Sequence, residues 1–225
     1  MNRFHKHEGP ITILGVVLAL TIIQIGADAE SSGSTNSIEE LEPELVPPKP
    51  TIWQSGIGEG FLPETRTFSL QAGVAPGMAT FGSKQAHDFA LMSLSYGHML
   101  GRVLCEGHWL RGNFEGRLEL FGGAQYSPSA EYIIGLTPHI RYDFATGTRW
   151  VPFLDFGAGV TATSIGPPDM SGTFEFNLQA TAGLHWFLRN NLALTSEVRY
   201  SHISCAGINH PNLGANNVWF MIGVT

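Results

Sequence analysis

The chain has 225 residues and a formal net charge of −7, with 27 glycines and only 14% charged residues. This acidic balance excludes the basic surface that a nucleic-acid-binding protein needs. Low charge, many glycines and scattered aromatic residues favour a β-structure with frequent turns. After the N-terminal segment, no apolar run reaches the roughly 20 residues of a transmembrane helix.

Residues 1–29 have the features of a secretory signal peptide. A basic start precedes an apolar core over residues 11–25, and Ala27 and Ala29 form a small-x-small cleavage site. This pattern predicts cleavage after Ala29 and export from the cytoplasm. The alternative is an uncleaved helical anchor, which the acidic, Ser-rich stretch after Ala29 disfavours.

Residues 30–52 are acidic, rich in Ser and Pro, and poor in aromatic residues. A segment of this composition cannot bury enough apolar surface to fold by itself. We therefore expect a periplasmic linker here, followed by a single domain over residues 53–225.

Polar and apolar residues alternate along the chain from Thr65 onward. A period of two places one face of a strand against apolar surroundings and the other face against polar ones. An even number of strands also lets an antiparallel sheet close on itself and lose its edges. The alternation predicts eight strands, over residues 66–74, 89–98, 109–121, 132–144, 151–163, 173–187, 192–204 and 216–224.

Two features favour a transmembrane barrel over a soluble β-barrel or sandwich, which is the alternative. The expected strands have the length that crosses a bilayer at a tilt, roughly 9–11 residues or more. Charged residues also occupy mid-strand positions on the polar face, as in the wet interior of a barrel. We predict an eight-stranded antiparallel transmembrane β-barrel. Its expected interior network is Arg111, Glu115, Arg117, Glu119, Arg141, Asp143, Asp155, Glu175, Glu197 and Arg199.

The lengths of the connections indicate how this barrel is oriented. Short periplasmic turns and longer external loops are typical of outer-membrane barrels. With both termini periplasmic, the connection 100–108 is the exception, because it is periplasmic and long. Cys105 and Cys205 then lie at opposite ends, too far apart for a disulfide. The short turns are 145–150 and 188–191, and the expected external loops are 75–88, 122–131, 164–172 and 205–215.

His202 and Ser204 end the seventh expected strand. Two residues apart, they project from one face about 6.6 Å from each other along the strand, so the imidazole can act as general base for the hydroxyl. An H-x-S pair also arises by chance, and two polar residues where a strand leaves the membrane are the alternative. Alternation places both residues on the lipid-facing side, which Asn216 shares on the last strand. Because polar groups on a lipid face are costly unless they are used, this arrangement predicts a site for a lipid substrate.

The stretch that contains these residues resembles the lipid A 3-O-deacylase family of outer-membrane enzymes. The resemblance rests on the motif H-x-S-x-A-G followed by P-N-x-G, and it extends more loosely over residues 53–225. The matching residues are His202, Ser204, Ala206, Gly207, Pro211, Asn212 and Gly214.

The resemblance implies a hydrolase of the bacterial outer membrane whose site faces the outer leaflet. Ser204 would be the nucleophile and His202 the general base. The Gly207 backbone N–H and the Asn212 side chain would form the oxyanion hole. The reaction would remove the ester-linked 3-hydroxyacyl chain at position 3 of lipid A, with no metal or organic cofactor. The implied partners are lipopolysaccharide and outer-membrane lipids but no nucleic acid, and a homodimer is left open.

Two positions depart from the family pattern. Cys205 stands where the family has Asn, and Asn216 stands where it has a Glu that orients the imidazole. Replacing the orienting Asp of a serine protease by Asn costs about 10⁴ in rate through a wrong tautomer, although Cys-His-Asn sites are active. Glu197 has the wrong parity to substitute for the missing carboxylate. We expect an active His202–Ser204 pair oriented by Asn216. The alternative is a non-catalytic barrel: a degenerate homologue, an adhesin or a lipopolysaccharide-binding anchor.

Two other kinds of site are disfavoured by the sequence. Cys205 could be a nucleophile, but its parity directs it away from His202. The remaining histidines are scattered over different strands and loops without metal-ligand spacing, so we expect no metal site.

Overall fold

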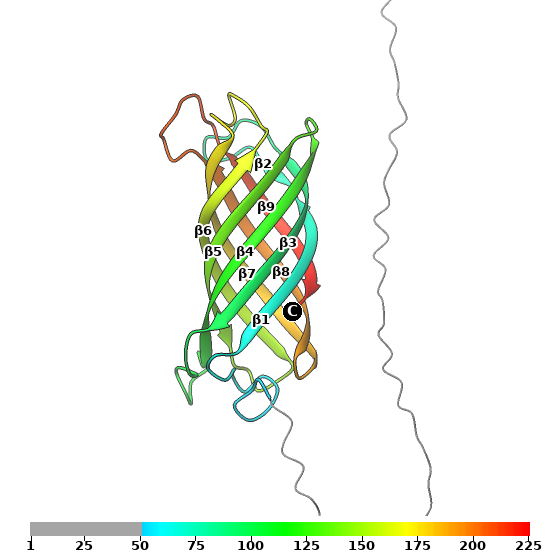
Figure 1. Ribbon diagram of the computed structural model, residues 1–225, viewed down its shortest axis with the longest axis vertical. Helices are drawn as coiled ribbons and strands as arrows, with labels where there is room; N and C mark the ends of the chain where they lie inside the picture. Colours follow the sequence, from blue (N-terminus) through cyan, green and yellow to red (C-terminus); the bar gives the residue numbers. More distant parts are fainter. Residues whose placement is uncertain (1–50) are drawn as a thin grey trace, which may run out of the picture. The chain divides into compact units, whose positions relative to one another are not determined.

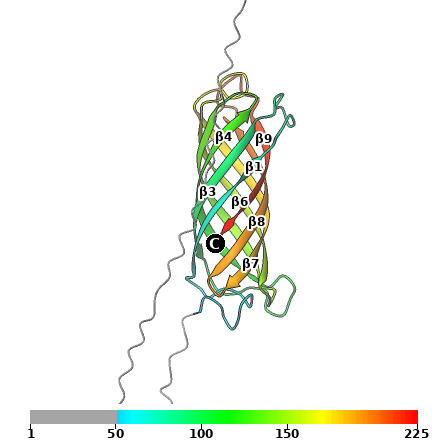
Figure 2. The same cartoon turned by 90° about the vertical axis from the view of Figure 1, so that its right-hand side faces the viewer.

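The computed structural model describes residues 51–225, and the expected signal peptide and most of the expected linker lie outside the described residues. Nine strands form one antiparallel sheet that closes into a barrel, because the first strand pairs with the last (Figures 1 and 2). Eight of them are long, which confirms the predicted fold. The long strands are β1 (Arg66–Ala75), β3 (Asp88–Met99), β4 (Gly112–Ser127), β5 (Tyr132–Phe144), β6 (Trp150–Thr163), β7 (Phe174–Arg189), β8 (Leu192–Ser204) and β9 (Ala215–Val224).

The ninth strand, β2 (Gly77–Met78), has only two residues and pairs with β9 at Asn216 and Asn217. Pro76 separates it from β1, because proline has no backbone N–H to continue the hydrogen-bonded ladder. A side chain at position 77 would meet the His87 backbone nitrogen at 2.3 Å, so this close approach needs a glycine. Nothing in the residue pattern predicted β2. This short strand brings the segment that follows it toward β9.

The distal end of β4 was predicted wrongly. The structure continues β4 to Ser127, so the connection expected over 122–131 has only the residues 128–131. Gly122 and Gly123 resemble a turn in the sequence, but both pair with β5. A Cβ at Gly123 would meet the Leu91 side chain at 2.5 Å, so this glycine makes room for the interior packing. Among residues 51–225, no helix is long and apolar enough to cross a membrane.

The outer face of the barrel is apolar, the reverse of a soluble protein. Phe68, Phe156 and Leu178, for example, are each more than half exposed and alternate with buried neighbours on their strands. A broad belt of large exposed apolar side chains is what a bilayer accommodates and water does not.

Polar and charged side chains fill the middle of the interior. The Arg199 guanidinium pairs with Glu119 and Glu197, and Arg117 Nη1 lies 2.5 Å from Asp155 Oδ2. These side chains are all buried, and a buried charge persists only when it is paired. The interior of the described barrel is therefore packed with side chains, as expected for eight strands.

Arg111, predicted to belong to this network, lies outside it. Because β4 begins only at Gly112, Arg111 ends the preceding loop, and its Nη1 lies 2.6 Å from Glu59 Oε2. The alternation across the range 109–111 was a chance pattern in a loop.

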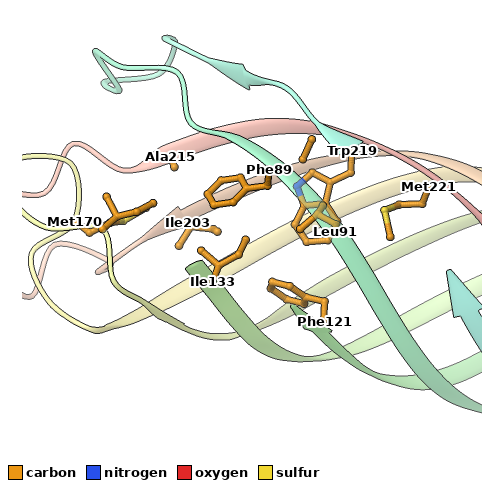
Figure 3. Close-up of a cluster of buried hydrophobic side chains, with 11 residues drawn as sticks. Phe89, Leu91, Phe121, Ile133, Met170, Ile203, Ala215, Trp219 and Met221 are labelled. Atoms are coloured by element: carbon orange, nitrogen blue, oxygen red, sulfur yellow. The ribbon is translucent and has the colours of Figure 1, made fainter. Parts of the chain in front are cut away.

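Apolar clusters close the interior above and below the charged middle. In one cluster, Phe121 meets Trp219 edge to face at 5.0 Å between ring centroids, and Met170 joins from the loop 164–173 (Figure 3). In the other, Trp53 stacks on Phe61 at 4.4 Å and meets the Phe187 ring at 4.7 Å. The segment before β1 therefore packs into the barrel as a stopper.

The two ends of the barrel carry different parts of the chain. We call the end with the stopper segment 51–65 and the C-terminus the proximal end, and the end with the loops 164–173 and 205–214 the distal end (Figure 1). Cys105 follows the proximal end of β3 and Cys205 follows the distal end of β8. Both are free thiols, as their predicted separation requires.

Candidate active site

His202 and Ser204 lie on the outer face of β8, at its distal end. The residues between and before them, Ile203 and Ser201, are buried in the interior, so the predicted parity is confirmed. His202 Nε2 lies 3.0 Å from Ser204 Oγ. This distance is within the range of a nucleophile and its general base.

The register of β8 and β9 brings Asn216 to the imidazole. His202 and Asn216 are directly paired across the two strands, and His202 Nδ1 lies 2.8 Å from Asn216 Oδ1. Side chains opposite each other on one face of an antiparallel pair are neighbours, even though here they are separated by a long loop in the chain. The three residues therefore form a continuous chain of contacts, in the order Asn216, His202, Ser204.

Asn216 faces outward, as predicted, but it does not meet lipid. It is only 1% exposed, because the segment after β2 covers it. The Asn216 Nδ2 donates to the Thr80 carbonyl at 2.7 Å, and the Tyr200 hydroxyl donates to Asn216 Oδ1 at 2.7 Å. Thr80 and Tyr200 are the site residues that the sequence did not reveal. Tyr200 shares the parity of His202 and could have been found, whereas nothing in the sequence connects Thr80 to the site.

A cleft of about 270 Å³ opens beside Ser204, between the segment after β2 and the loop 205–214. Gly214 has a φ of +72°, and a Cβ there would lie 3.2 Å from His202 Cε1. This glycine therefore keeps the space beside the imidazole free. The lining residues are Phe81, Gly82, His202, Ser204, Cys205, Gly207, Asn209, His210, Asn212 and Leu213.

The two residues expected to form the oxyanion hole line this cleft, and the amide of one of them, Asn212, already has partners. The Asn212 Nδ2 donates to both carboxylate oxygens of Glu175 at 2.9 Å and to Ser171 Oγ at 3.2 Å. Glu175 was expected in the central charged network and instead holds this loop from the distal end of β7. Gly207 lies in the same loop and also lines the cleft. The structure thus places both residues in the cleft beside Ser204, with the Asn212 amide held by Glu175.

Cys205 is turned away from the imidazole, as its parity predicted. Its side chain is buried, and its Sγ contacts the Asn209 backbone at 3.2 Å to the carbonyl and 3.4 Å to the nitrogen. The Asn209 N–H, together with the Ser171 hydroxyl, lowers the pKa of the Cys205 thiol. The thiol therefore stabilises the loop.

No group of three or more His, Cys, Asp or Glu residues that could hold a metal ion occurs within residues 51–225.

An apolar groove of about 460 Å³ runs down the outside of the barrel from His202. Ala158 and Ala180 form its floor, because their small side chains leave a hollow among larger neighbours. Phe156, Leu178 and Tyr200 form its sides. The groove lies on β6, β7 and β8 and faces the region that lipid occupies.

Residues 94–225 match the family model described as lipid A 3-O-deacylase (PagL). The chain belongs to this family. Membership assigns the protein to the bacterial outer membrane and to the lipid A deacylases. No curated protein sequence matches the chain.

Two solved structures support the fold of this lipid A 3-O-deacylase family member. The outer membrane enzyme PagL has 22% sequence identity and a TM-score of 0.55, over 69% of this chain and 97% of its own. Neisserial surface protein A (NspA) has 15% identity and a TM-score of 0.50, over 72% of this chain and 97% of its own. At these identities, both likenesses concern the barrel alone.

Proposed function

We propose that the protein hydrolyses the ester-linked 3-hydroxyacyl chain at position 3 of lipid A, with Ser204 as nucleophile and His202 as general base. Asn216 orients the imidazole. The observation that carries the proposal is the contact chain Asn216–His202–Ser204 on the outer face of the barrel, beside an apolar groove. A hydrolase of soluble substrates would gain nothing from a site that opens sideways into lipid.

The reaction follows from this geometry in two steps. His202 Nε2 accepts the proton of Ser204 as Oγ attacks the ester carbonyl, and the imidazolium then protonates the departing sugar oxygen. Water, deprotonated by the same nitrogen, next attacks the acyl-enzyme, releases the 3-hydroxy fatty acid and restores the serine hydroxyl.

Hydrogen-bond donors must stabilise the negative charge that develops on the carbonyl oxygen of the ester. We assign this role to the Gly207 N–H and the Asn212 amide, which line the cleft beside Ser204. Each such donor typically contributes about 2.7–4 kcal/mol to a transition state. Asn212 has to turn from Glu175 toward the cleft when substrate binds, so the loop 205–214 is part of the proposed machinery.

The groove below His202 fits the acyl chain of the substrate. Its walls of Phe156 and Leu178 are apolar, and its upper end is at the imidazole. Because the groove faces lipid, an acyl chain lying in it would exchange contacts with neighbouring lipid for van der Waals contacts with these side chains. We therefore propose that the distal end of the barrel faces the outer leaflet and that lipid A enters from the side.

The second candidate is a non-catalytic barrel that binds lipopolysaccharide. It is favoured by two observations: Asn216 brings no charge to the imidazole, and the Asn212 amide is held by Glu175. Such a barrel would leave the acyl pattern of lipid A intact.

Mass spectrometry of lipid A from cells that produce the protein separates the two candidates. The unmutated protein should remove one 3-hydroxyacyl chain, and Ser204→Ala should remove none. Ser201→Ala is the matched control, because Ser201 lies on the same strand with its side chain buried inside the barrel. An unchanged lipid A spectrum at verified expression and folding of the unmutated protein would refute the enzyme and leave the binding barrel.

A further inference from the structure

Asn216 has three polar neighbours, and one of them fixes which way its amide points. The Thr80 carbonyl lies 2.7 Å from the amide nitrogen, and a carbonyl oxygen only accepts hydrogen bonds. The NH₂ group must therefore face Thr80. The amide oxygen then faces His202 Nδ1 at 2.8 Å and the Tyr200 hydroxyl at 2.7 Å.

This orientation determines the tautomer of the imidazole. Because the Asn216 oxygen is an acceptor, His202 Nδ1 must carry the hydrogen that it receives. A neutral imidazole has only one N–H, so Nε2 keeps its lone pair and faces the hydroxyl of Ser204 at 3.0 Å. This is the form that can remove the proton from the serine.

The opposite orientation would abolish the general base. If the NH₂ group faced Nδ1, the hydrogen of the imidazole would move to Nε2, and no lone pair would meet Ser204. When the orienting Asp of a serine protease is replaced by Asn, kcat falls by a factor of about 10⁴ for this reason. The difference between an active and an inactive Ser-His-Asn arrangement is thus the side of the amide that meets the histidine.

We propose that the Thr80 carbonyl and the Tyr200 hydroxyl are positioning groups that allow an amide to replace the carboxylate at position 216. The proposal rests on the proposed function, since it explains how His202 becomes a base. Thr80 is held in place by local structure: its N–H donates to the Met78 carbonyl at 3.0 Å, and its carbonyl also accepts the Ser83 N–H at 3.1 Å.

The short strand β2, which lies just before Thr80 in the chain, explains how Thr80 reaches the amide. The short strand β2 pairs Met78 with Asn216, which brings the following residues over the amide. A carboxylate at position 216 has no hydrogen to donate to this carbonyl. The Thr80 carbonyl therefore favours an amide over a carboxylate at this position.

The tautomer can be observed directly by ¹⁵N NMR of the full barrel in detergent micelles with labelled histidine. The signal of His202 is identified by its loss in His202→Gln. At a pH where the imidazole is neutral, we expect the proton on Nδ1. A proton on Nε2, or an equal mixture of the two forms, would overturn the proposal. This measurement does not depend on ester hydrolysis, so a correct tautomer without lipid A deacylation would refute the proposed function alone.

A double-mutant cycle tests the role of Tyr200. Tyr200→Phe removes one hydrogen bond to the Asn216 oxygen and keeps the ring, so kcat should fall about 2- to 10-fold with KM unchanged. In an Asn216→Asp background, both side-chain oxygens are acceptors, and Tyr200→Phe should have no further effect. A purely structural tyrosine would lower kcat equally in both backgrounds, and that result would overturn the proposal.

The matched control is Tyr126→Phe, which lies on β4, a strand not hydrogen-bonded to β8 or β9. It should leave both kcat and KM unchanged. A fall in kcat equal to that of Tyr200→Phe would show that the loss of any tyrosine hydroxyl from the barrel surface is sufficient, and would count against the positioning role.

Discussion

Replacing Asn216 by Leu gives a graded test of the site. The two side chains have nearly the same shape, and the leucine removes only the amide contacts to His202, Tyr200 and Thr80. The Thr80 carbonyl keeps the Ser83 N–H, so it is not left unpaired. We therefore expect the fold to persist and the imidazole to lose its orienting partner.

The size of the effect follows from the contact that is lost. A hydrogen bond to a group that becomes charged, as His202 does during the reaction, contributes about 1.5–3 kcal/mol. Since about 1.4 kcal/mol is tenfold in rate, kcat should fall roughly 10- to 150-fold. Ser204→Ala, which removes the nucleophile itself, should abolish hydrolysis.

Initial rates of fatty acid release from lipid A in detergent micelles measure this change. Ser201→Ala is the control for barrel integrity, because Ser201 lies on β8 next to His202 with its side chain buried inside the barrel. Its folded fraction should retain the unmutated kcat. A fall of less than about twofold for Asn216→Leu, equal to less than about 0.4 kcal/mol, would show that the amide does not orient the imidazole.

Three further predictions concern the surroundings of the site. Cys205→Ala should retain hydrolysis of lipid A, because the thiol faces the loop and not the imidazole; abolished activity would make the thiol part of the reaction. Arg199→Ala leaves Glu119 buried without its cation and should lower the free energy of unfolding by about 3–5 kcal/mol in urea titrations; an unchanged midpoint would show that the ion pairs do not stabilise the barrel. Ala158→Leu fills the floor of the apolar groove and should raise KM more for long acyl chains than for short ones; an equal KM for all chain lengths would exclude the groove as the acyl site.

The strands could be predicted from the sequence because each one has two different surroundings. Lipid outside and polar side chains inside require apolar and polar residues to alternate along each strand. This alternation located seven of the eight long strands within two residues at each end. The exception is β4, which begins at Gly112 and not at residue 109, and whose distal end runs through two glycines. The same parity placed His202 and Ser204 on the outer face. These properties are local, since they depend only on the next neighbours along a strand.

The remaining features of the site and of the barrel ends depend on contacts between distant segments. Thr80 meets Asn216, Asn212 meets Glu175, and the stopper residue Trp53 meets Phe187, each across a large separation in the chain. The alternation of polar and apolar residues does not predict such contacts, because they arise from loops whose path is set by the closed barrel. From its sequence, Asn216 was a departure that weakened the family motif. The tertiary structure decided that the Thr80 carbonyl turns its amide oxygen toward the histidine, since a carbonyl can accept the amide hydrogens and cannot donate.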